Sequence, residues 1–257
     1  MQLAIELFLA AFVASVFGSM VGLGGGFILV PILRLAFGLP PALAAGTSLV
    51  LVTANSASGA FTYFLQKRVD VKLGLLFGAG GLPGSILGAM LTQHISEQAF
   101  DWAFGAFLVI VAGDMILNAK HRIQSRVEIE VGSRKAMSYR AAAALGFLVG
   151  LVSSTFGIGG GIIVIPSLLY FSDLPAHAIS ATSHFAIVLT SPVGLITHAF
   201  QHDIRIADVI PLVLGGLCGG PLGARLSLRL KSPQLLVVVG IALICVACSL
   251  GLRHVIR

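Results

Sequence analysis

The sequence predicts an all-α polytopic membrane protein made of two homologous halves with about four hydrophobic segments each. Hydrophobic residues make up 57% of the 257-residue chain and charged residues only 10%, whereas soluble domains carry about 25% charged residues. Apolar stretches long enough to cross a bilayer as helices recur along the whole length. A membrane β-barrel would show short alternating segments instead. A glycine-rich motif also occurs twice, at a fixed spacing.

The two copies of this motif run from Gly22 to Pro31 and from Gly157 to Pro166, and each position of the second lies 135 residues after its counterpart. A glycine in a helix interior costs about 1 kcal/mol relative to alanine. Glycine also readily adopts backbone angles that end a helix. We therefore expect each copy to break a membrane-embedded segment and to leave backbone N–H groups free.

The first half is predicted at residues 1–118, with hydrophobic segments at 3–37, 42–65, 73–91 and 100–117. The first segment is broken at the glycine motif. It is too long for one straight span of about 20 residues and too short for two full spans. A helix followed by a half-helix, either kinked or re-entrant, fits this length.

A polar linker is predicted at residues 119–139, and its basic residues favour the cytoplasmic side of the membrane. The second half, 140–257, repeats the pattern with segments at 141–171, 176–200, 207–228 and 235–252. The first of these is again broken, at Gly157–Gly161.

The same offset pairs other unusual residues, which supports an internal duplication. It pairs Thr47-Ser48 with Thr182-Ser183, and the glycines of one ladder, Gly80, Gly84 and Gly88, with those of another, Gly215, Gly219 and Gly223. Such ladders let helices approach closely, so we expect a packing role for them. Duplicated halves around a midplane site are typical of transporters. The distribution of Lys and Arg fits inverted and parallel repeats equally well, and the length of the broken segment favours inversion.

The glycine motifs are the first candidate binding site, through Gly24, Gly25, Gly26, Gly159, Gly160 and Gly161. The N-terminus of a helix carries about +0.5 charge and free N–H groups, so it binds anions. Two converging half-helices would need no buried Lys or Arg. The alternative is close helix packing through glycine.

Polar residues on the second segment of each half are further candidates. The hydroxyls of Thr47, Ser48, Thr182 and Ser183 would either donate to a substrate or bond a backbone carbonyl within the protein. Asn55 would line the site or join helices.

His184 has Leu49 as its counterpart, so it breaks the symmetry of the halves. It would be an anion ligand, a protonatable relay or a partner of a neighbouring helix. His177, His198 and His202 lie near segment ends, where we expect them at the membrane interface.

The remaining charge and composition exclude several functions. The net charge of +6 reflects basic loops of a membrane protein and not binding to nucleic acid. No His, Cys or Glu arrangement has metal-ligand spacing, and no cofactor is indicated. The spans hold few acidic residues, so coupling to a cation through a carboxylate is not supported, and the proton gradient is the simplest coupling.

The paired Gly-x-Gly-Gly-Gly-(x)4-Pro motifs, each followed by Leu-Pro and Thr-Ser, resemble the TauE/SafE sulfite exporter family, also called the toluene-sulfonate uptake permease family. The resemblance covers nearly the whole chain. It implies a multi-pass protein of the bacterial inner membrane that moves sulfur-containing anions such as sulfite, sulfonates or sulfoacetate. The motif positions that carry over are Gly22, Gly24, Gly25, Gly26 and Pro31, with Gly157, Gly159, Gly160, Gly161 and Pro166.

From the motifs and the resemblance together we expect a secondary transporter of small sulfur-containing anions. The anion would bind at the midplane between the halves, which would rock to give alternating access. An anion channel would use the same groups without alternating access. An intramembrane enzyme would need a nucleophile with a base, or a metal set, which the spans do not offer. The identity of the anion, the direction of transport and the oligomeric state stay open.

Overall fold

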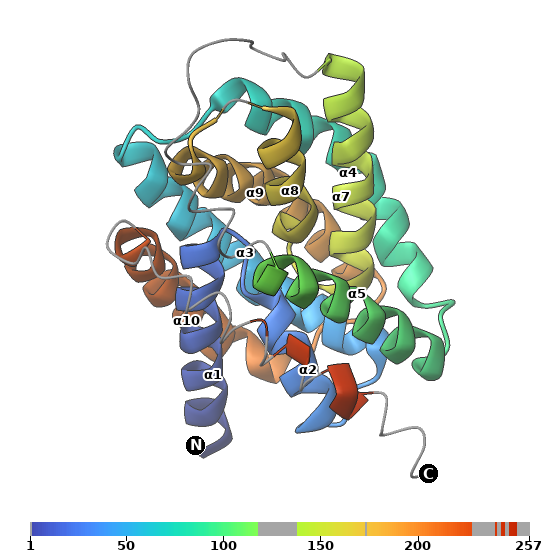
Figure 1. Ribbon diagram of the computed structural model, residues 1–257. Helices are drawn as coiled ribbons and strands as arrows, with labels where there is room; N and C mark the ends of the chain where they lie inside the picture. The colour runs from blue at the N-terminus through green and yellow to red at the C-terminus, as the bar shows by residue number, and fades with distance from the viewer. Residues whose placement is uncertain are drawn as a thin grey trace. The chain divides into compact units, whose positions relative to one another are not determined.

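The structure is a computed structural model that describes residues 2–117, 138–172, 174–227 and part of 240–250. These residues form helices and contain no strand (Figure 1). The helices are α1 (Gln2–Val21), α2 (Gly26–Leu35), α3 (Pro41–Leu65), α4 (Val71–Thr92), α5 (Glu97–Leu117), α7 (Tyr139–Phe156), α8 (Gly161–Phe171), α9 (Ala176–Phe200) and α10 (Ile206–Leu226). Within the described ranges, six helices are long and apolar enough to cross a membrane, namely α1, α3, α4, α7, α9 and α10.

The predicted segments are found as helices, with both breaks at the glycine motifs. The first segment is α1 followed by the short α2, and its counterpart is α7 followed by the short α8. Asp70 begins α4 by accepting a hydrogen bond of 2.9 Å from the N–H of Leu73. Pro41 begins α3 because its fixed φ suits the first turn of a helix, and Pro175 directly precedes α9 as its N-cap residue. The linker at 119–139 and the segment at 235–252 lie mostly outside the described residues.

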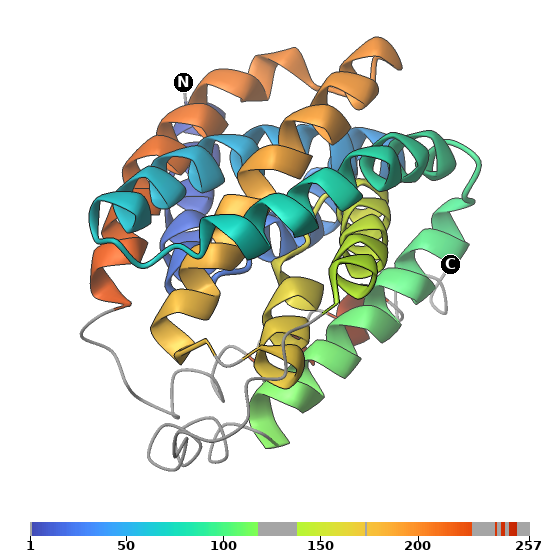
Figure 2. The same cartoon turned by 90° about the horizontal axis from the view of Figure 1, so that it is seen from above.

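The described helices belong to two compact units. One contains α1 to α4 and α7 to α10, and the other contains α5 and the described part of residues 240–250. Within the first unit, α1 and α3 pack extensively against α10, while α7 and α9 pack extensively against α4 (Figures 1 and 2). The third span of each predicted half therefore packs with helices of the other half. We call α1, α2, α3 and α10 the first bundle, and α7, α8, α9 and α4 the second bundle.

The two glycine ladders make these contacts, as their spacing predicts. A Cβ on Gly84 or Gly88 would clash with the carbonyl oxygen of Phe147 or Leu151 on α7. A Cβ on Gly223 of the other ladder would clash with the carbonyl of Val16 on α1. Because only glycine leaves this space, the backbones of paired helices touch directly.

The order of these contacts gives the direction of each helix. Gly80, Gly84 and Gly88 meet Ala143, Phe147 and Leu151 in rising order, so α4 and α7 run the same way. In contrast, Gly59, late in α3, faces His184, early in α9, and Gly194, late in α9, faces Leu49, early in α3. Helices α3 and α9 thus run in opposite directions, which is the relation that an inverted repeat requires.

The short helix α2 folds back along α1. A Cβ on Gly25 would lie 2.8 Å from the carbonyl oxygen of Ala14. Leu7 and Ala14 of α1 share a buried apolar cluster with Leu29 and Leu33 of α2. Of the two forms expected for the first segment, kinked or re-entrant, the structure has the re-entrant one, because α2 returns along α1.

Candidate functional site

The turns at residues 22–26 and 157–161, here called the glycine loops, are held in a backbone conformation that favours glycine. Gly22, Gly24 and Gly25 have φ of 94°, 88° and 86°. The matching values at Gly157, Gly159 and Gly160 are 70°, 91° and 71°. Residues that carry a Cβ rarely adopt such backbone angles. Each loop therefore ends one helix and starts a short one, as the sequence predicts.

The two glycine loops pack against each other. A Cβ built on Gly24 would lie 3.5 Å from the Cα of Gly159. A Cβ on Gly26 would clash with the carbonyl of Gly157, and one on Gly161 would clash with that of Gly22. All of these residues are buried. The glycines thus allow close packing between the halves, and they bring the N-termini of α2 and α8 together.

The first N–H groups of both short helices have no hydrogen-bond partner among the described residues. In the described part of the chain, no hydrogen bond is donated by the N–H groups of Gly24, Gly25, Gly26 and Phe27. The same holds for their counterparts Gly159, Gly160, Gly161 and Ile162. The first N–H groups of any helix lack an acceptor within that helix. Here they lie on buried residues, where an unpaired N–H is costly, so an acceptor from outside the protein would stabilise them.

Ser48 and Ser183 each hold the glycine loop of the opposite half. The hydroxyl of Ser48 donates to the carbonyl oxygen of Gly157 over 2.8 Å. The hydroxyl of Ser183 donates to the carbonyl oxygen of Gly22 over 2.9 Å. The structure therefore favours the alternative in which these hydroxyls bond a backbone carbonyl. Their role as substrate donors stays a prediction and requires both bonds to open.

Thr47 and Thr182 hold the starts of the third spans. The Thr47 Oγ1 accepts a hydrogen bond of 3.0 Å from the N–H of Arg205, just before α10. The Thr182 Oγ1 accepts one of 3.0 Å from the N–H of Asp70, just before α4. Each bond joins two helices of one bundle. In each Thr-Ser pair, the threonine therefore makes a hydrogen bond within its own bundle, and the serine makes one to the glycine loop of the other bundle.

Asn55 connects α3 to the first glycine loop and to α1. Its Nδ2 donates to the carbonyl oxygen of Gly24 over 3.0 Å, and its Oδ1 accepts from the hydroxyl of Ser19 over 2.8 Å. The Ser19 Oγ also lies 3.1 Å from Nε2 of His184. All three side chains are fully buried. A chain of polar contacts therefore runs from His184 through Ser19 and Asn55 to the first glycine loop.

This polar chain has no copy in the second half. The counterparts of Ser19, Asn55 and His184 are Ser154, Thr190 and Leu49. The Ser154 hydroxyl has no hydrogen-bond partner among the described residues, and the Thr190 hydroxyl bonds carbonyls of its own helix. Sequence reasoning identified Asn55 and His184 but missed Ser19. Ser19 has a serine, Ser154, at the matching position of the other half, and this pair was the available signal. The signal is weak because serines are common in membrane spans.

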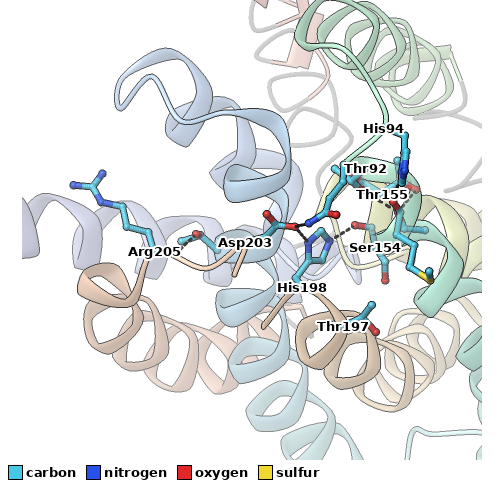
Figure 3. A network of polar contacts seen from close by, with 12 residues as sticks. Thr92, His94, Ser154, Thr155, Thr197, His198, Asp203 and Arg205 are labelled. Carbon is cyan, nitrogen blue, oxygen red and sulfur yellow. Dashed lines mark hydrogen bonds and ion pairs between the residues drawn. The ribbon is translucent and has the colours of Figure 1, made fainter. Parts of the chain in front are cut away.

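Tyr63 and His198, which occupy matching positions, fasten the ends of α1 and α7. The Tyr63 hydroxyl donates to the carbonyl oxygen of Ser19 over 2.5 Å. The His198 Nε2 lies 3.0 Å from the carbonyl oxygen of Ser154, and its Nδ1 lies 3.3 Å from a carboxylate oxygen of Asp203 (Figure 3).

The side chain of His198 is fully buried in the protein, and its expected position at the membrane interface stays a prediction. The turn after α9 folds back over the helix end and covers it. His202 in that turn is exposed, and the side chain of His177 lies outside the described residues.

No group of three or more His, Cys, Asp or Glu side chains is placed to hold a metal ion in the described ranges. The arrangement instead offers backbone donors at two helix N-termini, held by hydroxyl and amide side chains. These groups suit an anion, since the N–H groups at both helix N-termini are hydrogen-bond donors without an acceptor among the described residues.

Comparison with known proteins gives the family. The family model described as "Sulfite exporter TauE/SafE" matches residues 7–250. The chain belongs to the TauE/SafE sulfite exporter family. This finding confirms the resemblance of the paired glycine motifs, and with the apolar helices it makes the chain a multi-pass protein of a membrane transporter family.

Several curated relatives of this TauE/SafE chain are similar over nearly their whole length. The probable membrane transporter protein YunE of Bacillus subtilis (strain 168) is 31% identical over 255 residues, which are 93% of each chain. The probable membrane transporter protein MJ0441 of Methanocaldococcus jannaschii is 29% identical over 91% of this chain and 93% of its own. A probable membrane transporter protein of Xylella fastidiosa (strain 9a5c) is 26% identical over 89% and 87%. No solved structure matches the chain.

Proposed function

We propose that this protein is a secondary transporter of a small sulfur-containing oxyanion, with sulfite or an organosulfonate as substrate. The observation that carries the proposal is the pair of glycine loops, whose buried N–H groups have no acceptor in the described part of the chain. In a bilayer, irregular backbone is tolerated only where it is buried in protein or lines a cavity. An anion held between the loops would accept these hydrogen bonds.

An oxyanion suits this geometry better than a cation or a neutral molecule. Helices α2 and α8 have 10 and 11 residues, long enough for a helix dipole at each N-terminus. Sulfite and sulfonates present three oxygens on one sulfur, so one anion could accept from both loops. The name of the family supplies the sulfur chemistry.

Alternating access would move the two bundles and not the two sequence halves. Helices α1 to α3 would move with α10, and α7 to α9 with α4, because these sets pack most extensively. The bonds of Ser48 to Gly157 and of Ser183 to Gly22 join the bundles. The glycine loops are buried in this structure, so the anion reaches them when one bundle tilts and these bonds open.

Transport by purified protein in liposomes tests the proposal. We expect saturable flux of labelled sulfite, with competition by thiosulfate or sulfoacetate. A native-state ligand also raises the melting temperature of the detergent-solubilised protein. We expect Gly160→Leu to abolish both effects, because φ at Gly160 is 71° and the nearest side-chain atom of Val149 is only 2.6 Å from an added Cβ.

The control is Gly113→Ala, since no neighbouring atom of the described residues lies within 4 Å of an added Cβ there. Size-exclusion chromatography of each variant separates loss of the site from loss of the fold. Flux that rises linearly with sulfite would indicate an anion channel. Absence of flux and of any melting shift with every sulfur anion would contradict the proposed substrate class.

A further inference from the structure

The polar contacts around His184 fix which of its ring nitrogens carries hydrogen. The Gly24 carbonyl can only accept, so the amide nitrogen of Asn55 must face it and Oδ1 must face Ser19. Oδ1 can also only accept, so the Ser19 hydroxyl must give its hydrogen to Asn55. The Ser19 oxygen is then left to accept from Nε2 of His184. Nε2 therefore carries the hydrogen, and Nδ1 carries the lone pair.

This lone pair is buried and has no partner. The Nδ1 atom of His184 makes no hydrogen bond within the described residues, although the side chain is fully buried. The opposite ring edge is packed, with Cδ2 only 2.9 Å from a Cβ built on Gly59. His184 thus presents a single basic nitrogen inside a membrane-spanning helix, where a polar side chain is expensive and commonly functional.

Few titratable or charged groups surround His184 on the helices packed against α9. From α3, the Tyr63 ring lies edge-on to the imidazole with 5.6 Å between the ring centres. The Arg68 guanidinium lies over the Tyr63 ring, 4.9 Å from the ring centre, and Asp70 reaches α9 through its backbone bond to Thr182. The facing group on α1 is the neutral Ser19. On α4, the charged side chain is Lys72, whose ammonium lies over the Tyr139 ring of α7 at 5.1 Å from the ring centre. Helix α8 contains no charged residue. No described carboxylate is placed to neutralise a proton on Nδ1.

We propose that His184 is the proton-binding residue that couples anion transport to the proton gradient, and that it takes the proton on Nδ1. The inference rests on the proposed transport of an oxyanion. The proton bonds to the Nδ1 lone pair and forms an imidazolium, which is costly in the membrane interior without a counter-charge. The transported anion supplies that charge, so proton and anion cross together.

The chain of polar contacts through Ser19 and Asn55 explains how a proton on His184 affects the anion site at the first glycine loop. A proton on Nδ1 makes the Nε2 hydrogen a stronger donor to Ser19, and this strengthens the bonds through Asn55 to the Gly24 carbonyl. The hydrogen bond to the Gly24 carbonyl of the first glycine loop is therefore stronger when His184 is charged. The position that matches His184 in the other half is Leu49, which cannot bind a proton. Among the described residues, this mechanism therefore carries one proton in each transport cycle and not two.

A pH gradient across liposomes that contain the full chain tests the coupling. We compare sulfite accumulation with an acidic exterior against accumulation at equal pH, as a ratio for each variant. A strictly coupled carrier gains about tenfold in this ratio for each pH unit. We expect the gain in wild type and in Ser154→Ala, and no gain in His184→Gln, which can still donate to Ser19 but cannot bind a proton. Ser19→Ala should reduce the gain, because it cuts the polar chain.

A His184→Gln protein that accumulates sulfite as wild type does would overturn the inference. Absence of sulfite flux in wild type would instead count against the proposed transport. A measurement independent of substrate then decides the proton site. In ¹⁵N NMR of histidine-labelled protein, the signals lost in His184→Gln should show hydrogen on Nε2 alone, and then on both nitrogens after acidification. Hydrogen on Nδ1 at high pH, or no change on acidification, contradicts the assignment for any transported anion.

Discussion

Ser48 on α3 donates its hydroxyl hydrogen to the carbonyl oxygen of Gly157 across 2.8 Å, so a helix of the first half holds the glycine loop of the second. Ser183 makes the reciprocal bond to Gly22 at 2.9 Å. Both bonds join the two bundles, beside the point where the glycine loops meet. Both bonds must break if the bundles separate at this point.

Ser48→Ala is expected to lower the free energy of unfolding by about 1–3 kcal/mol, because the buried carbonyl of Gly157 would lose its partner. Thermal unfolding in detergent measures the effect. Ser167→Ala is the matched control, since the Ser167 hydroxyl bonds only the Ile163 carbonyl of its own helix. Equal melting temperatures for the two variants would show that the bond between the bundles adds nothing to stability.

Gly84→Ala should destabilise the pairing of α4 with α7. The added Cβ would clash with the carbonyl oxygen of Phe147 and lie 2.9 Å from the N–H nitrogen of Leu151. Overpacking of this kind costs about 1–3 kcal/mol. The added Cβ of Gly113→Ala meets no neighbouring atom in the described part of the chain, so this substitution should be neutral or stabilising, since alanine favours a helix. The melting temperatures of the two variants should therefore move in different directions, and a common shift would contradict the backbone contact.

Tyr63→Phe removes one hydroxyl and leaves the Ser19 carbonyl without that donor. We expect a loss of about 1–2 kcal/mol in unfolding free energy, because the ring stays buried and only the hydrogen bonds of the hydroxyl, to Ser19 and more weakly to Ser227, disappear. Tyr139→Phe serves as the control, since Tyr139 is 60% exposed. If both substitutions leave the melting temperature unchanged, the Tyr63 hydroxyl does not fasten α1.

Single cysteines at Lys67 and His202 test the inverted arrangement of the repeats. Both residues are exposed, and they occupy matching turns after α3 and α9. Since α3 and α9 run in opposite directions, we expect the two turns on opposite faces of the membrane. In a background with Cys218, Cys245 and Cys248 replaced by serine, a membrane-impermeant maleimide added to intact cells should label one variant alone. Labelling of both or neither before lysis would indicate parallel repeats.

Much of the fold could be predicted because its strongest signals are local. A cluster such as Gly24-Gly25-Gly26 ends a helix wherever it lies, and the apolar spans have lengths set by the bilayer. The partners of polar residues could not be predicted in this way. Nothing near Ser48 in the chain indicates that its hydroxyl reaches Gly157, which is 109 positions away. The matched Thr-Ser pairs indicated that these positions matter, but a substrate donor and a loop anchor need the same residue types.

The gaps at the site have a similar cause. The position of His198 near the end of its segment does not indicate that the following turn brings a carboxylate oxygen of Asp203 within 3.3 Å of its ring. Ser19 was missed because one serine among apolar residues gives no sign of its neighbours. Only the structure places it between Asn55 and His184, which come from helices far apart in the sequence.

The exchange of third spans between the halves also governs how the protein is made. When α4 leaves the ribosome, its glycine face has no helix to pack on, because α7 follows only after the linker. Likewise, α1 can pack against α10 only late in synthesis, because α10 follows every other helix of the first bundle in the sequence. Neither half can mature by itself. Nascent chains must keep these faces covered by lipid or by the insertion machinery until synthesis is nearly complete, and two separately expressed halves would have to meet in the membrane before either becomes stable.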